Sequence, residues 1–270
     1  MEDFYSKNII SDLNPFNAWL FASKEDELVE KALFNKLKYL NILKDKKKLK
    51  ILDMGCSWGC TSFRVINVLN KISLDFTYYA LDPFIEQLNQ FKKLAEEKNI
   101  KNIRFIKNTL ENFNSKIEFD LVFTSHTLYY VQNIEKAIEK LLNLGKSIII
   151  IHQGENGIKG FHKRFHDLLK FEQNIDIIYP DLLSIIQELN PEKEFEVDIF
   201  VIKNKIDVSS CQDENSDFGK ALISFFLNSD FSLVNFNMRQ EIHDFFKNEM
   251  PEYMENETGL IMISKKPPIK

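Results

Sequence analysis

From residue 49 onward, short apolar runs alternate with longer stretches in which apolar side chains recur every three or four positions. Bounded apolar runs predict strands, and the longer spacing predicts helices with one buried face. Strands are expected near 49–54, 75–81, 102–107, 119–125 and 147–152, and helices near 58–70, 84–97 and 134–144. This alternation is typical of an α/β fold with a parallel sheet and right-handed crossover helices.

The alternation stops after His152. Residues 194–201 alternate polar and apolar side chains, which predicts a strand with one face in solvent, and the apolar run 259–264 predicts a closing strand. Helices are expected to begin near Phe161 and after Pro180, and to span about 216–227 and 238–248. We expect a single domain, with a core of about 45–153, 194–205 and 257–266 and a cap formed by 1–30, 154–193 and 206–256.

A further helix is expected to open at Ser23–Asp26, which resembles a capping box, and its apolar positions continue to Leu40. Glu25 would lie in the first turn of this helix, where the helix dipole favours a carboxylate. In a purely structural interpretation, stabilising the helix start is the role of Glu25.

The stretch after the first strand indicates a ligand site. Asp53 ends that strand, and the turn from Gly55 to Gly59 leads into a helix, so its backbone can approach a polar ligand closely. Asp82 follows the second strand roughly 20 residues further on, where Rossmann-type sites hold a ribose diol. The glycine spacing is not that of a dinucleotide site, which favours a nucleoside without a pyrophosphate, such as S-adenosylmethionine.

These motifs resemble those of the class I methyltransferases: Asp53-x-Gly55-x-x-x-Gly59, followed by Leu81-Asp82-Pro83. A narrower resemblance, to histamine N-methyltransferase and its relatives, is carried by several short segments. They are His126-x-Leu128-Tyr129-Tyr130-Val131, Asp82-Pro83-x-x-Glu86-Gln87, Ser23-x-Glu25, Glu214-Asn215…Gly219 and Asn256-x-Thr258. The resemblance implies a Rossmann-like, seven-stranded, doubly wound sheet with a small, mostly helical cap, acting on a small amine or imidazole.

The resemblance also implies which residues form the site. For the cofactor, S-adenosylmethionine, they are Asp53, Gly55, Ser57, Gly59, Asp82, Gln87, Asn108, Thr109, Leu110 and Ser125. For the substrate they are Phe16, Trp19, Glu25, His126, Tyr129, Tyr130, His162, Phe225 and Glu257. Among the latter, His126, Glu25 and Tyr130 are the candidate catalytic residues, with Glu25 as the partner of a protonated amine.

This chain departs from the pattern at three positions. Ser57 stands where the family often has glycine, His126 where it has glutamine, and Glu257 where it has asparagine. The last two suggest a substrate other than histamine itself. Structural interpretations stay open: His126 could be a hydrogen-bonded structural histidine, and Tyr129, Tyr130 and Phe225 could be packing residues, as could Phe161 and Phe165.

The composition of the chain limits the classes of binding partner that we expect. The chain of 270 residues carries a net charge of −5 and three cysteines, and its pI is about 5.7. An acidic chain disfavours nucleic acid, the absence of a long apolar run disfavours a membrane span, and the cysteine usage suits the reducing cytoplasm. We expect a small-molecule substrate, no metal, and a monomer or weak dimer.

Three other functions stay open. The protein could be a small-molecule O-methyltransferase with His126 as the base that deprotonates a phenol or carboxyl group. It could also bind S-adenosylmethionine without turnover and use its cap for a partner. A nicotinamide dehydrogenase is disfavoured, because the sequence contains no G-x-G-x-x-G motif.

Overall fold

The structure, a computed structural model, describes residues 13–37, 48–168, 174, 176–250 and 252–266. The first twelve residues of the expected cap, the first three of the expected core and Leu40 lie outside this part of the chain. Two compact units are present. We call them the sheet unit (Val29–His152, Glu172–Val201 and Gly259–Lys270) and the helical unit (Met1–Leu28, Gln153–Phe171 and Ile202–Thr258).

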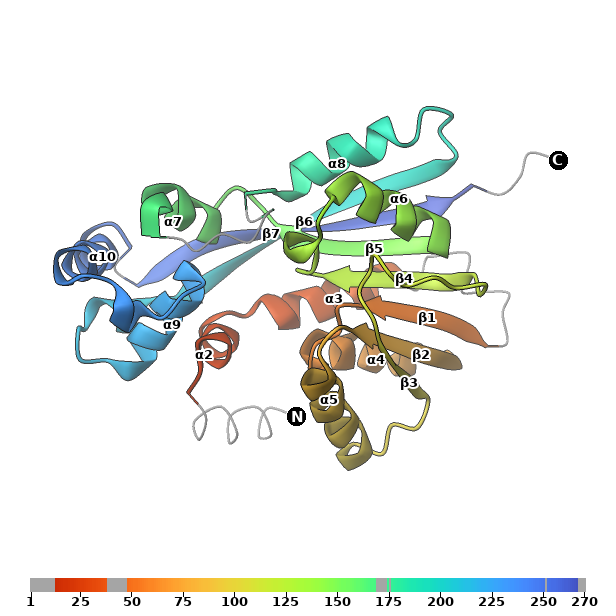
Figure 1. Ribbon diagram of the computed structural model, residues 1–270, viewed down its shortest axis with the longest axis horizontal. Coiled ribbons are helices and arrows are strands. Elements are labelled where there is room, and N and C mark those ends of the chain that lie inside the picture. The colour runs from red at the N-terminus through yellow and green to blue at the C-terminus, as the bar shows by residue number, and fades with distance from the viewer. Residues whose placement is uncertain (1–12, 38–47, 169–173, 175, 251, 267–270) are drawn as a thin grey trace. The chain divides into compact units, whose positions relative to one another are not determined.

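One seven-stranded sheet runs through the fold in the order β3-β2-β1-β4-β5-β7-β6 (Figure 1). Strands β1 to β4 are Leu49–Met54, Phe76–Asp82, Ile103–Lys107 and Phe119–Ser125, and β5 to β7 are Gly145–Gln153, Phe195–Asp207 and Tyr253–Lys265. The pairs β1–β2, β2–β3, β1–β4 and β4–β5 are parallel. The sheet and its flanking helices confirm the predicted fold class.

In the described part of the chain, the α-helices fall close to the predicted positions, apart from α2, which was not predicted. They are α2 (Pro15–Ala22), α3 (Glu25–Leu37), α4 (Cys60–Lys71), α5 (Ile85–Glu97), α6 (Ile134–Leu144), α7 (Ile158–Arg164), α8 (Tyr179–Glu188), α9 (Asp217–Leu227) and α10 (Phe236–Asn248). Tyr129 and Tyr130 belong to a single 3₁₀ turn, η2 (Leu128–Tyr130).

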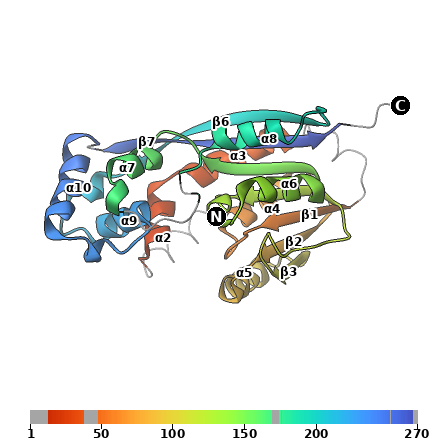
Figure 2. The same ribbon diagram turned by 45° about the horizontal axis from the view of Figure 1, so that its top comes forward.

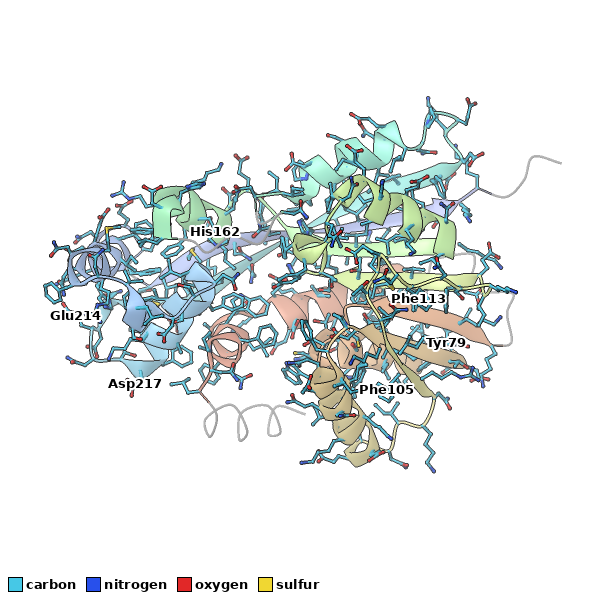
Figure 3. All side chains as sticks on the ribbon, in the orientation of Figure 1. Tyr79, Phe105, Phe113, His162, Glu214 and Asp217 are labelled. Carbon is cyan, nitrogen blue, oxygen red and sulfur yellow. The ribbon has the colours of Figure 1, made fainter. Side chains whose placement is uncertain are left out.

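Each face of the sheet buries an apolar layer. On one face, α6 and α8 pack side by side (Figure 1 and Figure 2). The same cluster takes in Tyr79 and Phe113 (both labelled in Figure 3), and the rings of both pack against Phe119. A second aromatic cluster joins α4, α5 and β3, because the Phe91 ring meets Phe63 and Phe105 edge-on at 5.0 and 5.3 Å.

Residues 172–193 differ from the prediction, which placed them in the cap. They belong to the sheet unit because Leu182 and Ile186 of α8 are fully buried in the same cluster as the strands and α6. The two late strands are also longer than expected, since β6 continues to Asp207 and β7 begins at Tyr253.

The helical unit has its own core. Helices α2, α7, α9 and α10 contribute a cluster in which Phe161 contacts the rings of Phe165, Phe226 and Phe246. Phe161 and Phe165 are 1% and 2% exposed. The packing interpretation of these two phenylalanines is therefore confirmed.

An ion-pair cluster links α3 to α4 within the sheet unit. The Glu30 carboxylate lies 3.0 Å from Arg64 Nη1 and 2.7 Å from Lys71 Nζ, and only 12% of its side chain is exposed. Burial alone would raise the pKa of Glu30, but hydrogen bonds and charge from Lys71 and Arg64 outweigh it and hold the pKa below 4.5.

Replacing Glu30 with glutamine is expected to lower the free energy of unfolding at pH 7 by about 1–3 kcal/mol, because the partly buried Arg64 and the exposed Lys71 lose their shared anion. The folded-state pKa of Glu30 is depressed, so its contribution is present above pH 4.5 and is lost as the pH falls through the folded pKa. Denaturant unfolding at pH 7 and pH 3 should show the difference shrinking. Asp75→Asn is the control: this exposed partner of Lys48 should change stability by less than about 0.5 kcal/mol. Equal effects of the two variants would contradict the assignment.

Candidate active site

The turn after β1 requires its two glycines. Gly55 and Gly59 have φ angles of +75° and +93°, in the left-handed region that favours glycine. A Cβ atom would lie 2.4 Å from Thr127 at the first position and 2.4 Å from Phe91 at the second. The N–H groups of Gly55 and Cys56 both donate to the Leu81 carbonyl, at 2.8 and 3.1 Å. These bonds hold the turn against the end of β2.

Asp82, the last residue of β2, lies directly beside this turn. Its carboxylate accepts hydrogen bonds from the backbone N–H groups of Ser57 and Phe84, both at 2.9 Å. Ser57 has a φ of +48°, the conformation for which a glycine would be favoured, and its hydroxyl donates to Gln87 Oε1 at 3.2 Å. A carboxylate has about four acceptor positions, so Asp82 can also bind a ribose diol. The predicted residues Ser57, Asp82 and Gln87 are thus brought together.

Asp53 lies beneath the turn instead of facing outward. It is 2% exposed and accepts hydrogen bonds from Ser62 Oγ at 2.5 Å and Tyr78 Oη at 2.6 Å. Burial raises the pKa of this carboxyl to about 6, against the lowering effect of these two hydrogen bonds. In this arrangement Asp53 supports the junction of β1, α4 and β2.

The turn after β3 reaches the same edge of the sheet. The Asn108 N–H donates to the Asp82 carbonyl at 3.2 Å, and Asn108 Oδ1 accepts from the Thr109 N–H at 2.9 Å. Leu110 is 6% exposed and joins the sheet core. Ser125 ends β4, the strand next to β1. Apart from Gln87, which lies on α5, the predicted cofactor residues therefore lie at or near the carboxyl ends of adjacent strands.

Three aromatic side chains, those of His126, Tyr129 and Tyr130, follow β4. His126 adopts a left-handed backbone, with a φ of +52°, and its Nδ1 lies 3.1 Å from the Tyr129 hydroxyl. The Tyr129 ring packs on His152, with centroids 4.3 Å apart, while Tyr130 is 62% exposed. A left-handed non-glycine residue at a strand end is typical of functional sites.

His152, near the end of β5, did not emerge from the sequence. It is 1% exposed, and its Nε2–H donates to the Ile177 carbonyl at 3.0 Å, which fixes the tautomer because a carbonyl can only accept. Burial, followed by the charge of His126, lowers its pKa to about 3, so the ring stays neutral. The available signal was a polar residue that ends the run Ile148–Ile151 at the carboxyl edge.

Within the helical unit, Glu25 belongs to a closed ring of hydrogen bonds. Its Oε2 accepts from Thr258 Oγ1 at 2.9 Å and Asn256 Nδ2 at 3.4 Å, and its N–H donates to Ser23 Oγ at 3.1 Å. Asn204 completes the ring by bonding both Asn256, at 3.1 Å, and Ser23, at 2.9 Å. Every member is less than 9% exposed. Glu25 is thus a buried, fixed carboxylate and not simply an exposed helix-start residue.

The predicted aromatic residues of this unit gather on α2 and α9. Trp19 stacks on Phe225 with centroids 5.1 Å apart, and Phe16 approaches both rings at 5.7 and 6.2 Å. His162 on α7 (Figure 3) is 4% exposed and its Nε2 bonds the Phe226 carbonyl at 2.8 Å. That bond gives His162 a structural role, tying α7 to the last turn of α9.

Glu257 holds the glycine-containing loop after β5. Its Oε1 accepts from the Glu155 N–H and its Oε2 from Asn156 Nδ2, both at 3.2 Å. A Cβ at Gly154 would meet the Glu257 side chain at 2.3 Å. Both carboxylate oxygens of Glu257 thus accept hydrogen bonds from the loop. The sequence predicted instead that Glu257 contacts the substrate.

Residues 45–175 match the model of a family described as a methyltransferase domain. These residues are an S-adenosylmethionine-dependent methyltransferase domain. The paired positive-φ glycines, Asp82 and Gln87 fit that cofactor, since they offer a close backbone approach and acceptors for a ribose diol. No curated protein matches the chain in a sequence search.

Solved structures share the methyltransferase fold at low sequence identity. A candidate methyltransferase from Bacillus halodurans has a TM-score of 0.58 at 16% identity, covering 86% of this chain and 98% of its own. The plantazolicin methyltransferase BpumL, solved with a desmethylPZN analog and SAH, has a TM-score of 0.52 at 14% identity, covering 97% and 89%. A candidate sarcosine dimethylglycine methyltransferase from Galdieria sulphuraria has a TM-score of 0.52 at 11% identity, covering 88% and 85%.

The predicted methyltransferase class and cofactor are therefore confirmed for this domain. The narrower resemblance to histamine N-methyltransferase is not carried by these comparisons and stays a prediction, as do the cytoplasmic location and the oligomeric state. Within the described part of the chain, no helix is long and apolar enough to cross a membrane, and no cluster of three metal-binding side chains occurs.

Asp82→Asn is expected to weaken S-adenosylhomocysteine binding about 10- to 100-fold, because hydrogen bonds to a charged acceptor contribute about 1.5–3 kcal/mol. Isothermal titration calorimetry measures the change. Glu86→Gln is the matched control, an exposed carboxylate in the first turn of α5, and should bind as the wild type does. Equal affinity of Asp82→Asn and the wild type would remove Asp82 from the cofactor site.

Proposed function

We propose that the protein N-methylates a small molecule bearing an amine or imidazole nitrogen, using S-adenosylmethionine as methyl donor. The observation that carries this proposal is the fixed, buried carboxylate of Glu25. Thr258 and Asn256 hold this carboxylate in one position, and a protonated amine suits it because that group supplies charge and hydrogen bonds together. The narrower resemblance, which includes Ser23-x-Glu25, points in the same direction.

The aromatic residues of the helical unit support a cationic ligand. Trp19 and Phe225 are stacked and Phe16 is 38% exposed, so this unit offers ring faces as well as a carboxylate. Each ring that meets a cation contributes about 0.5–2 kcal/mol. Among the structural neighbours, the Galdieria protein is described by two small N-methylated amines, sarcosine and dimethylglycine.

For methyl transfer, the protein's main contribution is to position the acceptor nitrogen relative to the methyl group. S-adenosylmethionine supplies a methyl group already activated by its sulfonium sulfur. The acceptor nitrogen must be neutral, in line with the departing sulfur and about 3–3.5 Å from the methyl carbon. His126, held through Nδ1 by the Tyr129 hydroxyl, is proposed to hydrogen-bond the acceptor and to take the proton that the nitrogen releases.

The alternative is O-methylation of a small phenol, since the same His126 ring can accept a phenolic proton. One assay separates the two. Purified protein is incubated with S-adenosylmethionine and a mixture of imidazole amines, other biogenic amines and phenols, and the products are identified by mass spectrometry. One added methyl on nitrogen supports the proposal, with an amine other than histamine expected as the preferred acceptor. A product methylated on oxygen favours the alternative, and cofactor binding without product places the substrate outside both classes.

Glu25→Gln is expected to raise KM for the amine substrate about 10- to 100-fold while kcat changes less than about threefold, because the contact binds ground state and transition state alike. Steady-state kinetics measure the split. Glu27→Gln provides the control, an exposed carboxylate in the same helical turn. A Glu25→Gln enzyme with wild-type KM and only reduced thermal stability would leave Glu25 as a structural residue.

A further inference from the structure

Thr127 lies where the end of β1 meets the turn after β4, and neither of the two methyltransferase resemblances had singled it out. It follows His126 directly, and its hydroxyl lies within donating distance of two backbone carbonyls, Met54 O at 3.2 Å and Ser125 O at 3.1 Å, which share its one proton. The Met54 carbonyl also accepts from Thr124 Oγ1 at 3.1 Å. Met54 is the last residue of β1, so two hydroxyls from the end of β4 hold the peptide group from which the glycine turn departs.

The side chain of Thr127 also fills the space beside the Cα atom of Gly55. A Cβ built on Gly55 would lie 2.4 Å from both Cγ2 and Oγ1 of Thr127, far inside van der Waals contact. Gly55 therefore packs directly on Thr127 while holding its positive φ. The orientation of the Met54–Gly55 peptide thus depends on hydrogen bonds and on contact with the same side chain.

Thr127 shapes the chain on its other side as well. Its carbonyl accepts from the Tyr130 N–H at 3.1 Å, closing the turn that carries Tyr129. The residue before it, His126, holds a left-handed backbone that a side chain rarely adopts. Such a conformation persists only where surrounding contacts fix it, and Thr127 supplies the adjoining contacts.

We propose that Thr127 is a positioning residue that sets the cofactor turn at Gly55 and the His126–Tyr130 turn together. It acts through the Met54 and Ser125 carbonyls and does not contact the reacting atoms. The effect on the cofactor turn rests on the geometry of the sheet unit alone. The effect on the acceptor rests on the proposed role of His126.

Two substitutions separate the hydroxyl from the shape. Thr127→Val keeps the volume and removes the hydrogen bonds, whereas Thr127→Ser keeps the hydroxyl and removes one methyl group. Calorimetry with S-adenosylhomocysteine is expected to show binding weakened roughly threefold to tenfold in Thr127→Val, the range set by one lost neutral hydrogen bond, and near wild type in Thr127→Ser. Thr77→Val, a partly exposed threonine of β2, controls for loss of a hydroxyl elsewhere in the sheet.

The effect of the Thr127 variants on the acceptor site is measured as changes in KM and kcat, with the substrate that the mixture assay identifies. Thr127→Val should lower kcat more than it changes KM, and Thr127→Ser should restore it. Wild-type affinity and kcat in Thr127→Val, with only a lower melting temperature, would overturn the proposal. If Thr127→Val does not fold, Thr127→Ala removes the same hydroxyl without added bulk, and its cofactor affinity decides. Because cofactor binding is measured without an acceptor, failure of the N-methylation proposal leaves this outcome readable.

Discussion

The cofactor side of this protein depends on how the chain leaves β1. Two consecutive N–H groups of the glycine turn bond one carbonyl, Leu81 O, and this forces the turn toward β2 at the point where Asp82 follows. The Asp82 carboxylate then receives the Ser57 N–H, and the Asp82 carbonyl receives the Asn108 N–H. Each bond uses a backbone group that the end of a parallel strand would otherwise leave unpaired. The hydrogen bonds that shape the site are therefore the same bonds that pair the backbone groups at the ends of these strands.

In the helical unit, the ring of polar side chains around Glu25 is buried, and its members satisfy one another by hydrogen bonding. Glu25, Asn204 and Asn256 are nearly inaccessible, and each bonds another member of the ring. Partly satisfied networks of this kind destabilise a core, whereas satisfied ones define a single arrangement of the elements that meet there. Here the ring joins the start of α3 to the strands β6 and β7, so the position of the Glu25 carboxylate is fixed by backbone elements on three sides.

The sequence predicted the strands, most helices and the cluster of polar strand ends, because local periodicity and glycine spacing encode them. It did not predict the partner of each side chain. Nothing local distinguishes Asp53, which turns inward to Ser62 and Tyr78, from Asp82, which lies beside the turn. Residues 172–193 were misplaced for the same reason, because the amphipathic α8 shows one apolar face but not the surface that buries it. The pairing of Glu257 with the 154–156 loop is likewise a contact between segments about 100 residues apart.

Two buried titratable groups of the sheet unit oppose each other as the pH falls. His152 has a folded pKa of about 3 against its usual 6.5, so stability declines by up to about 1.4 kcal/mol per pH unit between these values. Asp53 has a folded pKa of about 6 against 3.8, so stability rises at the same limiting rate as the pH falls from 6 to 3.8. The two burial penalties therefore act in opposite directions across the range they share. Below pH 4.5 the loss from His152 is joined by that of the Glu30 ion pairs, and below pH 3.8 the gain from Asp53 ends. Burying a histidine and a carboxyl in one unit thus gives its stability two pH-dependent contributions of opposite sign, although each burial alone is unfavourable.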